Sequence, residues 1–589
     1  MILVFGGTTE GRRAVEVLEE AGSPFYYSTR GNGQQIELVN GMRLTGGMDA
    51  PQMTDFCREH GIGLIVDASH PFAEELHGNL QRVAGLVGVP IVRYDRIYPE
   101  HEADITWCKD YDDAIRLLEA SHVTRLLTLT GVNTIGKLRR YWENHRDCWF
   151  RILSREASYE TARRQGFPEN RLVDDEAGNT SDLIARLRPQ AILTKESGRS
   201  GGFEEKVEAA RRAGVGVFDI ERPAYHPPTP KAQPVQIRYV NGPYGLRRAV
   251  EQLLPTFFRL HSGLTTGTCA TAAAIAAATR LTTGEMPEEV AVMLPNGETI
   301  GVRVGYGNDY AYCIKEAGDD PDITDGVEVR ASVRRSEAFG ILGGEGVGTI
   351  TLPGFDYPPG SPAINRGPRE MIRQNVKEDV EITISVPHGA EIARKTFNPR
   401  LGIEGGLSII GVSGIVKPFS EEAFVDSIRK CMTIARASGA HRVVINSGGK
   451  SERFVKALYP DLPRQAFVEY GNYVGETLKM AHDLGFRRVT LGVMLGKAVK
   501  LAAGNLDTHS RKTVMDKVFV GQMLKEAGCD MDIGGITLAR ELWDSIPAER
   551  TEGFAHSVIA HCHEHCRGLL PDGELTILLI DDNGRIYGR

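Results

Sequence analysis

Short apolar runs alternate with amphipathic helical patterns along residues 1–225, and this alternation constrains the fold more than any other feature of the chain. Helical patterns such as Arg12–Ala21 and Glu204–Ala213 lie between several of the runs. Strands that alternate with helices form a mostly parallel sheet with helices on its faces. The runs predicted to be strands are Ile2–Phe5, Phe25–Tyr27, Leu64–Asp67, Ile91–Tyr94, Arg125–Leu129, Trp149–Ile152, Ala191–Thr194 and Gly216–Ile220.

Polar clusters follow several of these strands. They read GGTTEG after the first strand, DASHPF further on, and then TLTGVNT and TKESGRSGG. Ligands of parallel sheets bind at the carboxyl ends of the strands. This regular placement predicts one ligand-binding crevice in a Rossmann-like α/β region.

The pattern changes after residue 225. The stretch AYHPPTPKAQP predicts a linker or extended arm over 226–261, with a short apolar helix at Leu246–Leu260. From His261 a threonine-rich turn enters an alanine-rich helix, β-rich stretches follow, and strands are expected again at Arg442–Asn446, Arg488–Met494 and Thr576–Ile580. We therefore expect a domain over 1–225, a linker over 226–261 and a separate mixed α/β domain over 262–589, which indicates a fusion of two activities.

Composition excludes several classes of protein. At 589 residues the chain is too long for one core. Its 69 basic and 77 acidic residues give a net charge of −8, which argues against nucleic-acid binding. No apolar run approaches the roughly 20 residues that span a bilayer. Nine cysteines without regular spacing, and a Met1 that leads directly into a strand, predict a cytoplasmic protein. Oligomerisation stays possible.

The loop GGTTEG departs from the dinucleotide-binding pattern G-x-G-x-x-G. Gly6 and Gly11 hold the first and third glycine places, but Thr8 holds the second. Thr8 narrows the approach of a pyrophosphate and, like Thr9, offers a hydroxyl donor instead. The alternative is a tight strand-to-helix turn that binds no ligand.

The second strand ends in Ser28, Thr29 and Arg30, where NAD-binding sites usually carry an acidic residue. A hydroxyl pair and an arginine suit a 2′-phosphate, which favours NADPH over NADH. Arg30 as an ordinary surface charge is the alternative, so both cofactors stay open.

Four blocks of the first half occur in a distinctive order: GGTTEGR, DASHPFA, LTGVNTI and TKESGRSGGFEEKVEAARRAGVGVFDIERP. They resemble the precorrin-6A reductase family, the CbiJ and CobK proteins of cobalamin synthesis. The resemblance implies two α/β subdomains and hydride transfer from a nicotinamide to a tetrapyrrole. It also implies cofactor contacts from Gly6, Thr8, Thr9, Gly11 and Ser28, and substrate contacts from Ser69, His70, Lys195, Ser197 and Gly198. For His70 a proton donor and a structural hydrogen bond are both open.

The second half carries longer distinctive blocks, among them SGLTTGTCATAAAIAAATRL, GEGVGTITLPGF, NPRLGIEGGLSIIGVSGIVKPFS and GKAVKLAAGNLDTHS. They resemble the CbiD family of cobalt-precorrin-5B C1-methyltransferases, which use S-adenosylmethionine. The resemblance implies that this half makes cobalt-precorrin-6A and that the first half consumes it, so the fusion carries two consecutive steps.

Candidate site residues of the second half are inferred from what the methyl donor and the methyl transfer require. Glu404, Gly405 and Gly406 offer glycine-rich backbone and a carboxylate for the methyl donor, with a close-packed turn as the alternative. Methyl transfer to an electron-rich ring carbon needs proximity more than a strong base, so Asp507 and His509 are candidates to accept a proton or steer the substrate. The residues expected to bind an anion at the start of the alanine-rich helix are Thr265, Thr266 and Thr268.

The run AHCHEHC at 560–566 places His561 and His565, and Cys562 and Cys566, four residues apart. A structural metal is conceivable, but the family resemblance requires none, and no metal site is predicted.

Together these inferences predict a bifunctional enzyme of anaerobic cobalamin synthesis. One alternative is a tetrapyrrole-binding carrier in which one or both halves are degenerate. Another is a general NAD(P)H dehydrogenase fused to a methylase of other metabolism.

Overall fold

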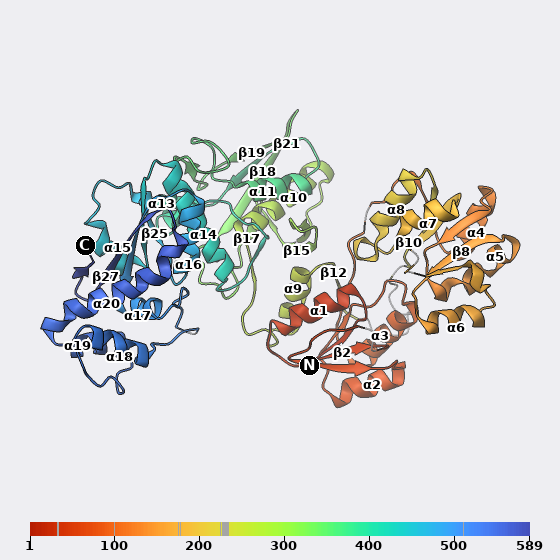
Figure 1. The fold of residues 1–589 in the computed structure, drawn as a ribbon. Coiled ribbons are helices and arrows are strands. Elements are labelled where there is room, and N and C mark those ends of the chain that lie inside the picture. The colour runs from red at the N-terminus through yellow and green to blue at the C-terminus, as the bar shows by residue number, and fades with distance from the viewer. Residues whose placement is uncertain are drawn as a thin grey trace. The chain divides into compact units, whose positions relative to one another are not determined.

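The computed structural model describes residues 1–589 except 32–33, 99, 175, 177, 224, 226–234, 511 and 589. Contacts within the chain divide it into two units. Unit 1 comprises Met1–His261 and Met293–Ile300, and unit 2 comprises Ser262–Val292 and Gly301–Arg589. Figure 1 colours the chain from red at the N-terminus to blue at the C-terminus.

Unit 1 contains two parallel six-stranded sheets. The first has the order β12-β5-β4-β1-β2-β3, and its central strands are mostly apolar and buried, with helices on both faces. Helices α1 and α9 pack on one face, and α2 and α3 pack on the other. The elements are β1 (Ile2–Phe5), α1 (Thr9–Glu19), β2 (Phe25–Thr29), β3 (Gly41–Thr45), α2 (Ala50–Glu59), β4 (Leu64–Asp67), α3 (Glu74–Val87), β5 (Ile91–Tyr94), β12 (Ile237–Val240) and α9 (Pro243–Leu253).

The second sheet has the order β6-β11-β10-β7-β8-β9. Two apolar clusters, one on each face, pack its strands against helices. The elements are β6 (Ile105–Cys108), α4 (Tyr111–Ala120), β7 (Arg125–Thr128), α5 (Arg139–Asn144), β8 (Asp147–Ile152), α6 (Glu156–Arg164), β9 (Leu172–Asp174), α7 (Thr180–Leu187), β10 (Ala191–Lys195), α8 (Phe203–Arg212) and β11 (Gly216–Ile220).

The segment expected to be a linker is partly folded into the first sheet. Residues 226–234 lie outside the described residues, but β12 pairs in parallel with β5, and α9 buries Leu246 and Val250 in the same core as α1. The expectation of an arm over all of 226–261 is therefore corrected, because this stretch completes one edge of the sheet and covers one of its faces.

Unit 2 begins with the alanine-rich helix α10 (Thr266–Thr283), which packs against a mixed sheet of order β16-β17-β18-β21-β19. The other elements of this part are β13 (Gly263–Leu264), β14 (Glu289–Met293), β15 (Thr299–Arg303), β16 (Gly305–Tyr306), β17 (Ala311–Ile314), β18 (Glu328–Arg335), β19 (Gly340–Gly343), β20 (Thr349–Ile350), α11 (Arg366–Asn375), β21 (Val380–Ser385), α12 (Gly389–Ala393), α13 (Asn398–Leu401), β22 (Ile403–Glu404) and β23 (Ile415–Val416).

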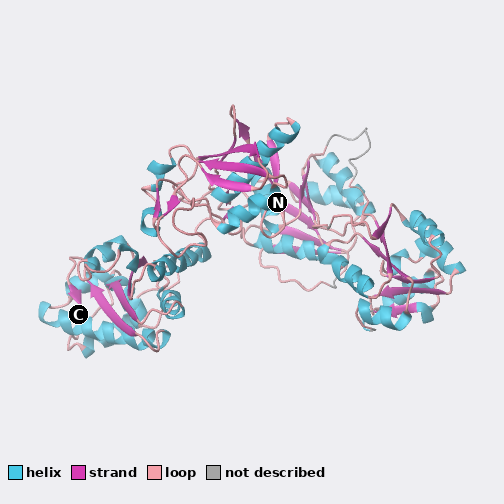
Figure 2. Ribbon diagram, turned by 90° about the horizontal axis from the view of Figure 1, so that it is seen from above, coloured by secondary structure: helices cyan, strands magenta, loops and turns pink. Residues whose placement is uncertain are grey.

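The rest of unit 2 is an α/β layer whose sheet has the order β25-β24-β26-β27-β28, parallel except for the last pair. Figure 2 shows helices on both sides of these strands near the C-terminus. The elements are α14 (Glu421–Ala437), β24 (Arg442–Asn446), α15 (Gly449–Lys456), β25 (Phe467–Glu469), α16 (Val474–Asp483), β26 (Arg488–Met494), α17 (Leu495–Ala502), α18 (Lys517–Glu526), α19 (Ala539–Ser545), α20 (Ala548–Cys566), β27 (Glu574–Ile580) and β28 (Ile586–Tyr587).

The predicted fold class is confirmed: parallel α/β sheets precede a separate mixed α/β part. Among the described helices, none combines the length and the apolar character needed to cross a bilayer.

Candidate functional site

The turn after β1 uses Thr8 as a structural residue. Its hydroxyl accepts a hydrogen bond from Gly11 N at 3.0 Å, which caps α1, and donates one to the carbonyl of Ala68 at 2.7 Å. The hydroxyl expected to meet a phosphate is thus engaged within the protein. Thr9, the first residue of α1, is half-buried.

Gly7 offers the exposed backbone of this turn. Its φ is +93°, and no heavy atom lies within 4 Å of the position that a Cβ would take. A Cβ at Gly6, by contrast, would overlap the ring of Tyr27, and one at Gly11 would lie 2.8 Å from the Cα of Gly6. Gly7 N donates to the hydroxyl of Tyr27 at 3.1 Å, so Gly7 gives a ligand room for close approach but no free N–H. The donors left for a pyrophosphate at this turn are those of the α1 N-terminus.

The carboxyl end of β2 carries no acidic side chain. Ser28 and Thr29 are buried, and Arg30 is exposed. Arg43 of the neighbouring strand β3 donates to the carbonyl of Gln34, and its buried Nε has no hydrogen-bond partner. The positive charge of the guanidinium fits a 2′-phosphate better than a bare ribose hydroxyl.

Glu10 joins this turn to the second sheet. Its buried carboxylate accepts hydrogen bonds from Arg96 Nε at 3.1 Å and from the hydroxyl of Ser200. Arg96 also donates to the carbonyl of Ser197 at 2.6 Å, and Gly198 has a left-handed φ of +64° that brings the loop against Arg96. Ser197 and Gly198, expected to contact substrate, thus also hold the two loops together.

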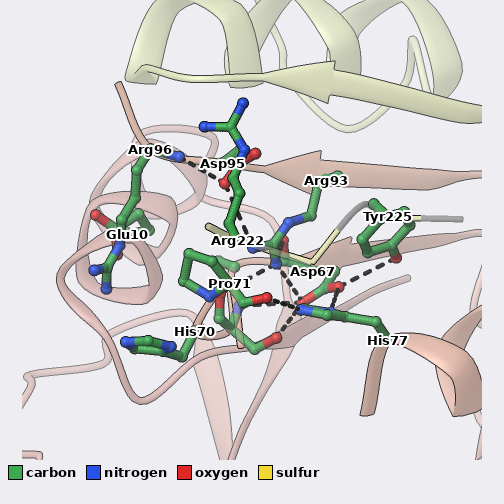
Figure 3. Close-up of polar contacts among 12 residues, drawn as sticks. Glu10, Asp67, His70, Pro71, His77, Arg93, Asp95, Arg96, Arg222 and Tyr225 are labelled. Carbon is green, nitrogen blue, oxygen red and sulfur yellow. Dashed lines mark hydrogen bonds and ion pairs between the residues drawn. The ribbon is translucent and has the colours of Figure 1, made fainter. Parts of the chain in front are cut away.

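A buried charge network lies at the end of β4 (Figure 3). Asp67 is fully buried and forms ion pairs with Arg93 at 3.0 Å and His77 at 2.7 Å. Ser69 and Tyr225 donate their hydroxyls to the same carboxylate at 2.6 and 3.2 Å. Burial alone would raise the pKa of Asp67, but Arg93 and His77 hold it well below its usual range.

His70 follows this network on the loop from β4 to α3. Its Nδ1 accepts a hydrogen bond from Phe72 N at 3.2 Å. Burial, together with Arg96 and Lys195, lowers the pKa of His70 to about 3. The imidazole is therefore neutral near pH 7, with its proton on Nε2, and both roles left open for His70 stay predictions.

Lys195, the last residue of β10, contacts Phe72 on the loop between β4 and α3. Its Nζ lies 5.0 Å from the ring centroid of Phe72, and no described carboxylate pairs with it. Burial and the neighbouring Lys206 and Lys137 lower the pKa of Lys195 to about 8. The structure thus brings His70 and Lys195, distant in sequence, into one cation-rich region suited to carboxylates.

In unit 2 the three predicted threonines are engaged internally. Thr265 caps α10 by accepting from Thr268 N at 3.1 Å, and Thr268 donates to the carbonyl of Gly414 at 2.6 Å. The hydroxyl of Thr266 accepts from Ile410 N at 2.9 Å. These contacts fix the loop over 408–414 against the start of α10.

The run expected to hold the methyl donor lies on β22 and after it. Glu404 and Gly405 are exposed, and Gly406 is buried. A Cβ at Gly406 would overlap the carbonyl of Gly346, so this glycine permits close backbone packing. The geometry supports the close-packed alternative for Gly406.

Asp507 and His509 lie beside the loop that follows β25. Asp507 forms a bridge with Tyr473, an ion pair with Lys512 at 2.9 Å and a hydrogen bond from His509 N at 3.1 Å. Burial alone would raise the pKa of Asp507, but the hydrogen bonds from Lys512 and His509 N hold it below its ordinary value. Such a carboxylate is better placed to orient a cation than to accept a proton.

The cysteines and histidines of 560–566 do not converge. Cys562 and Cys566 are buried in the core, and His561 pairs with Glu526 at 2.9 Å. Across the described residues, no group of three His, Cys, Asp or Glu side chains is placed to hold a metal ion.

Sequence reasoning missed Arg93, Arg96 and Glu469. The signal for Arg93 was an arginine inside the apolar run Ile91–Tyr94, since a charge there requires a buried partner. Glu469 lies 21 residues after Gly448, the first glycine of SGGKS, a spacing typical of acidic residues that bind ribose.

Comparison with known proteins gives two family matches. Residues 1–238 match the family described as precorrin-6x reductase CbiJ/CobK, and residues 256–418 match CbiD. The cobalt-precorrin-5B C(1)-methyltransferase of Prosthecochloris aestuarii is 42% identical over 345 residues, covering 54% of this chain and 94% of the relative. That of Thermus thermophilus is 40% identical over 345 residues, covering 55% and 92%.

Two solved structures also match. One is the cobalamin biosynthesis protein CbiD from Archaeoglobus fulgidus, with 30% identity and a TM-score of 0.26, covering 43% of this chain and 83% of that one. The other is the CobK precorrin-6A reductase, with 20% identity and a TM-score of 0.34, covering 43% and 97%. On the sequence matches, the chain belongs to the CbiD family of cobalt-precorrin-5B C(1)-methyltransferases, and its residues 1–238 match the CbiJ/CobK family model.

Proposed function

We propose that this chain catalyses two consecutive steps of cobalamin synthesis. Unit 2 methylates C1 of cobalt-precorrin-5B with S-adenosylmethionine, and unit 1 reduces the resulting cobalt-precorrin-6A to cobalt-precorrin-6B with NADPH or NADH. The observation that carries the proposal is the presence of both family matches in one chain, together with an alignment that covers 94% of a named methyltransferase. Nine free cysteines fit a cytoplasmic location.

In unit 1 the nicotinamide cofactor supplies the hydride when it is bound. The N-terminus of α1 beside Gly7 would hold its pyrophosphate, and Ser28 near the end of β2 and Arg43 in the middle of β3 would face the adenosine ribose. Arg43 favours NADPH. Lys195 would bind a substrate carboxylate, and neutral His70 would orient a ring substituent through Nε2–H.

In unit 2 the methyl donor supplies an electrophilic carbon, so the protein has chiefly to align the two reactants. Asp507, held as a carboxylate by Lys512, would fix the loop that carries His509. His509 would then steer the macrocycle or accept a proton. The oligomeric state does not enter this mechanism.

Anaerobic incubation of the purified chain with cobalt-precorrin-5B, S-adenosylmethionine and NADPH or NADH tests the proposal. Mass analysis of the corrinoid should show a gain of one methyl group, and then of two hydrogens only with reduced nicotinamide. Methylation without reduction would leave unit 1 as a binding domain. Binding without any mass change would favour the carrier.

The reductase step should weaken as pH rises through about 8. Lys195 is protonated below its pKa of about 8 and loses its charge above it, so kcat/KM for the polycarboxylate substrate should fall about tenfold between pH 7 and 9.5. Lys195→Met should be about tenfold slower at pH 7 and should lack this inflection. Lys109→Met, which changes an exposed lysine, serves as the control. An unchanged inflection in Lys195→Met would remove Lys195 from the substrate site.

A further inference from the structure

The last sheet of unit 2 has a topological switch point that no predicted site residue occupies. From β24 the chain crosses to β25 on one side, and the next strand, β26, lies on the other side of β24. All three strands are parallel, so their carboxyl ends meet at one edge. In open α/β sheets a crevice forms at this point and binds ligands. The strands β25 and β27 and the helix α15 are labelled in Figure 1.

A glycine turn connects β24 to α15 at this edge. Ser447, Gly448 and Gly449 follow the strand, and Gly448 precedes the helix without any side chain to cap it. The backbone of the first helical turn is therefore not covered by a capping side chain. A turn of this kind lets a ligand approach the main chain closely.

Glu469 ends the neighbouring strand β25 beside this turn. It stands opposite Asn446 in the parallel register, and a Cβ on Gly448 would lie 3.5 Å from its Oε1. The carboxylate is half-buried, and the described residues give it no hydrogen bond or ion pair. Burial raises the pKa of Glu469, and the Arg400 and Lys497 charges oppose that rise. A carboxylate partly withdrawn from water needs hydrogen-bond donors.

Asn446 provides a second unsatisfied group at the same place. Its side chain is fully buried, and its Oδ1 has no hydrogen-bond partner. A Cβ on Gly492 of β26 would lie 2.8 Å from this oxygen, so the amide lies between the two strands whose ends form the crevice. A buried acceptor without a donor indicates a missing partner such as a ligand or water.

We propose that Glu469 and the turn over 446–449 hold the ribose of S-adenosylmethionine. An acidic side chain at the end of the strand next to a glycine turn is the arrangement that accepts hydrogen bonds from adenosine ribose hydroxyls. The site takes the place of the exposed run over 404–406 expected from the sequence. It also lies beside the loop of Asp507, because Thr508 N donates to the carbonyl of Asn472 at 3.0 Å. The assignment rests on the proposed methyl transfer.

Equilibrium dialysis of the full chain with S-adenosylhomocysteine, a stable product analogue, tests this site without turnover. Glu469→Gln should raise the Kd about tenfold or more, because a charged acceptor of two hydroxyls becomes a neutral one. The 2′-deoxy analogue should bind the unaltered chain about tenfold more weakly, and Glu469→Gln should no longer distinguish the two compounds. Glu476→Gln, on the exposed face of α16, is the matched control.

The possible outcomes distinguish a failure of the ribose site at Glu469 from a failure of the proposed methyl transfer. If the unaltered chain binds S-adenosylhomocysteine and Glu469→Gln binds it equally well, the site is wrong and the methyl transfer stands. A loss in Glu404→Gln instead would also overturn the site. If the unaltered chain does not bind the compound, both the proposed methyl transfer and the site fail, whereas the proposed reduction by unit 1 is unaffected. A folding defect in Glu469→Gln would appear in its circular dichroism, and recovery of affinity in Glu469→Asp would then support the contact.

Discussion

Replacing Asp67 by asparagine is expected to destabilise the first sheet of unit 1 by about 3 kcal/mol. The side chain of Arg93 is 3% exposed and that of Asp67 is fully buried, so the substitution leaves a guanidinium in the core without its main counter-charge. Asp95, 3.6 Å from Arg93, remains as a weaker partner and keeps the loss at the lower end of the range. Hydrogen exchange of peptides that cover β4 and β5 would measure the change.

The same variant should disturb catalysis by displacing a loop. Arg93 donates to the carbonyls of Asp67 and Ser69, and Ser69 leads directly to His70. Reduction should therefore slow while methyl transfer is unaffected. Asp95→Asn, which changes a carboxylate that is 26% exposed, is the control and should cost less than about 1 kcal/mol. Equal protection in Asp67→Asn and the unaltered chain would show that the ion pair contributes little.

The network also sets the response of unit 1 to acid. The pKa of Asp67 is lower in the folded chain than in the unfolded one, so its contribution is present above the unfolded pKa of about 4. It is lost as pH falls below that value.

The central strands could be predicted from the sequence, and the edge strands could not. The strands of unit 1 that the sequence analysis omitted are β3, β6, β9 and β12, and all four lie at sheet edges. In unit 2 the omitted β25 is also an edge strand. A central parallel strand is mostly apolar because both of its faces are covered, whereas an edge strand is partly exposed, as in β3 and β12.

A site residue could be predicted from the sequence where its role depends on the conformation of neighbouring backbone. Gly6 and Gly11 could be recognised from their spacing, because both positions exclude a Cβ. The role of Thr8 could not, since its hydroxyl bonds to Ala68, 60 residues away. Glu469 was missed together with its strand. Its spacing from the glycines of SGGKS could be read from the sequence, but the three-residue edge strand β25 was not recognised, so the acid was not placed at a strand end next to β24.

Replacing Gly346 by alanine is expected to destabilise unit 2 by about 4 kcal/mol. Gly346 has a φ of +71°, and a Cβ there would overlap the carbonyl of Val386. The carbonyl of Gly346 in turn occupies the positions that a Cβ would take on Gly389 and Gly406, and it accepts a hydrogen bond from Leu407 N at 2.8 Å. The backbone is held from both sides, so neither neighbour can move away without breaking the contact.

Gly284→Ala distinguishes the two causes of the lower stability expected for Gly346→Ala, which are backbone strain and steric overlap of the new Cβ. Gly284 ends α10 with a φ of +78°, but nothing lies within 4 Å of its Cβ position, so alanine there introduces the backbone strain alone and should cost about 1 kcal/mol. Thermal unfolding and hydrogen exchange of peptides from unit 2 would measure both variants. Gly346→Ala should lose methyl transfer and keep reduction. If it were no less stable than Gly284→Ala, the glycines of GEGVG would be free to contact a ligand, and the close-packed interpretation of this block would be wrong.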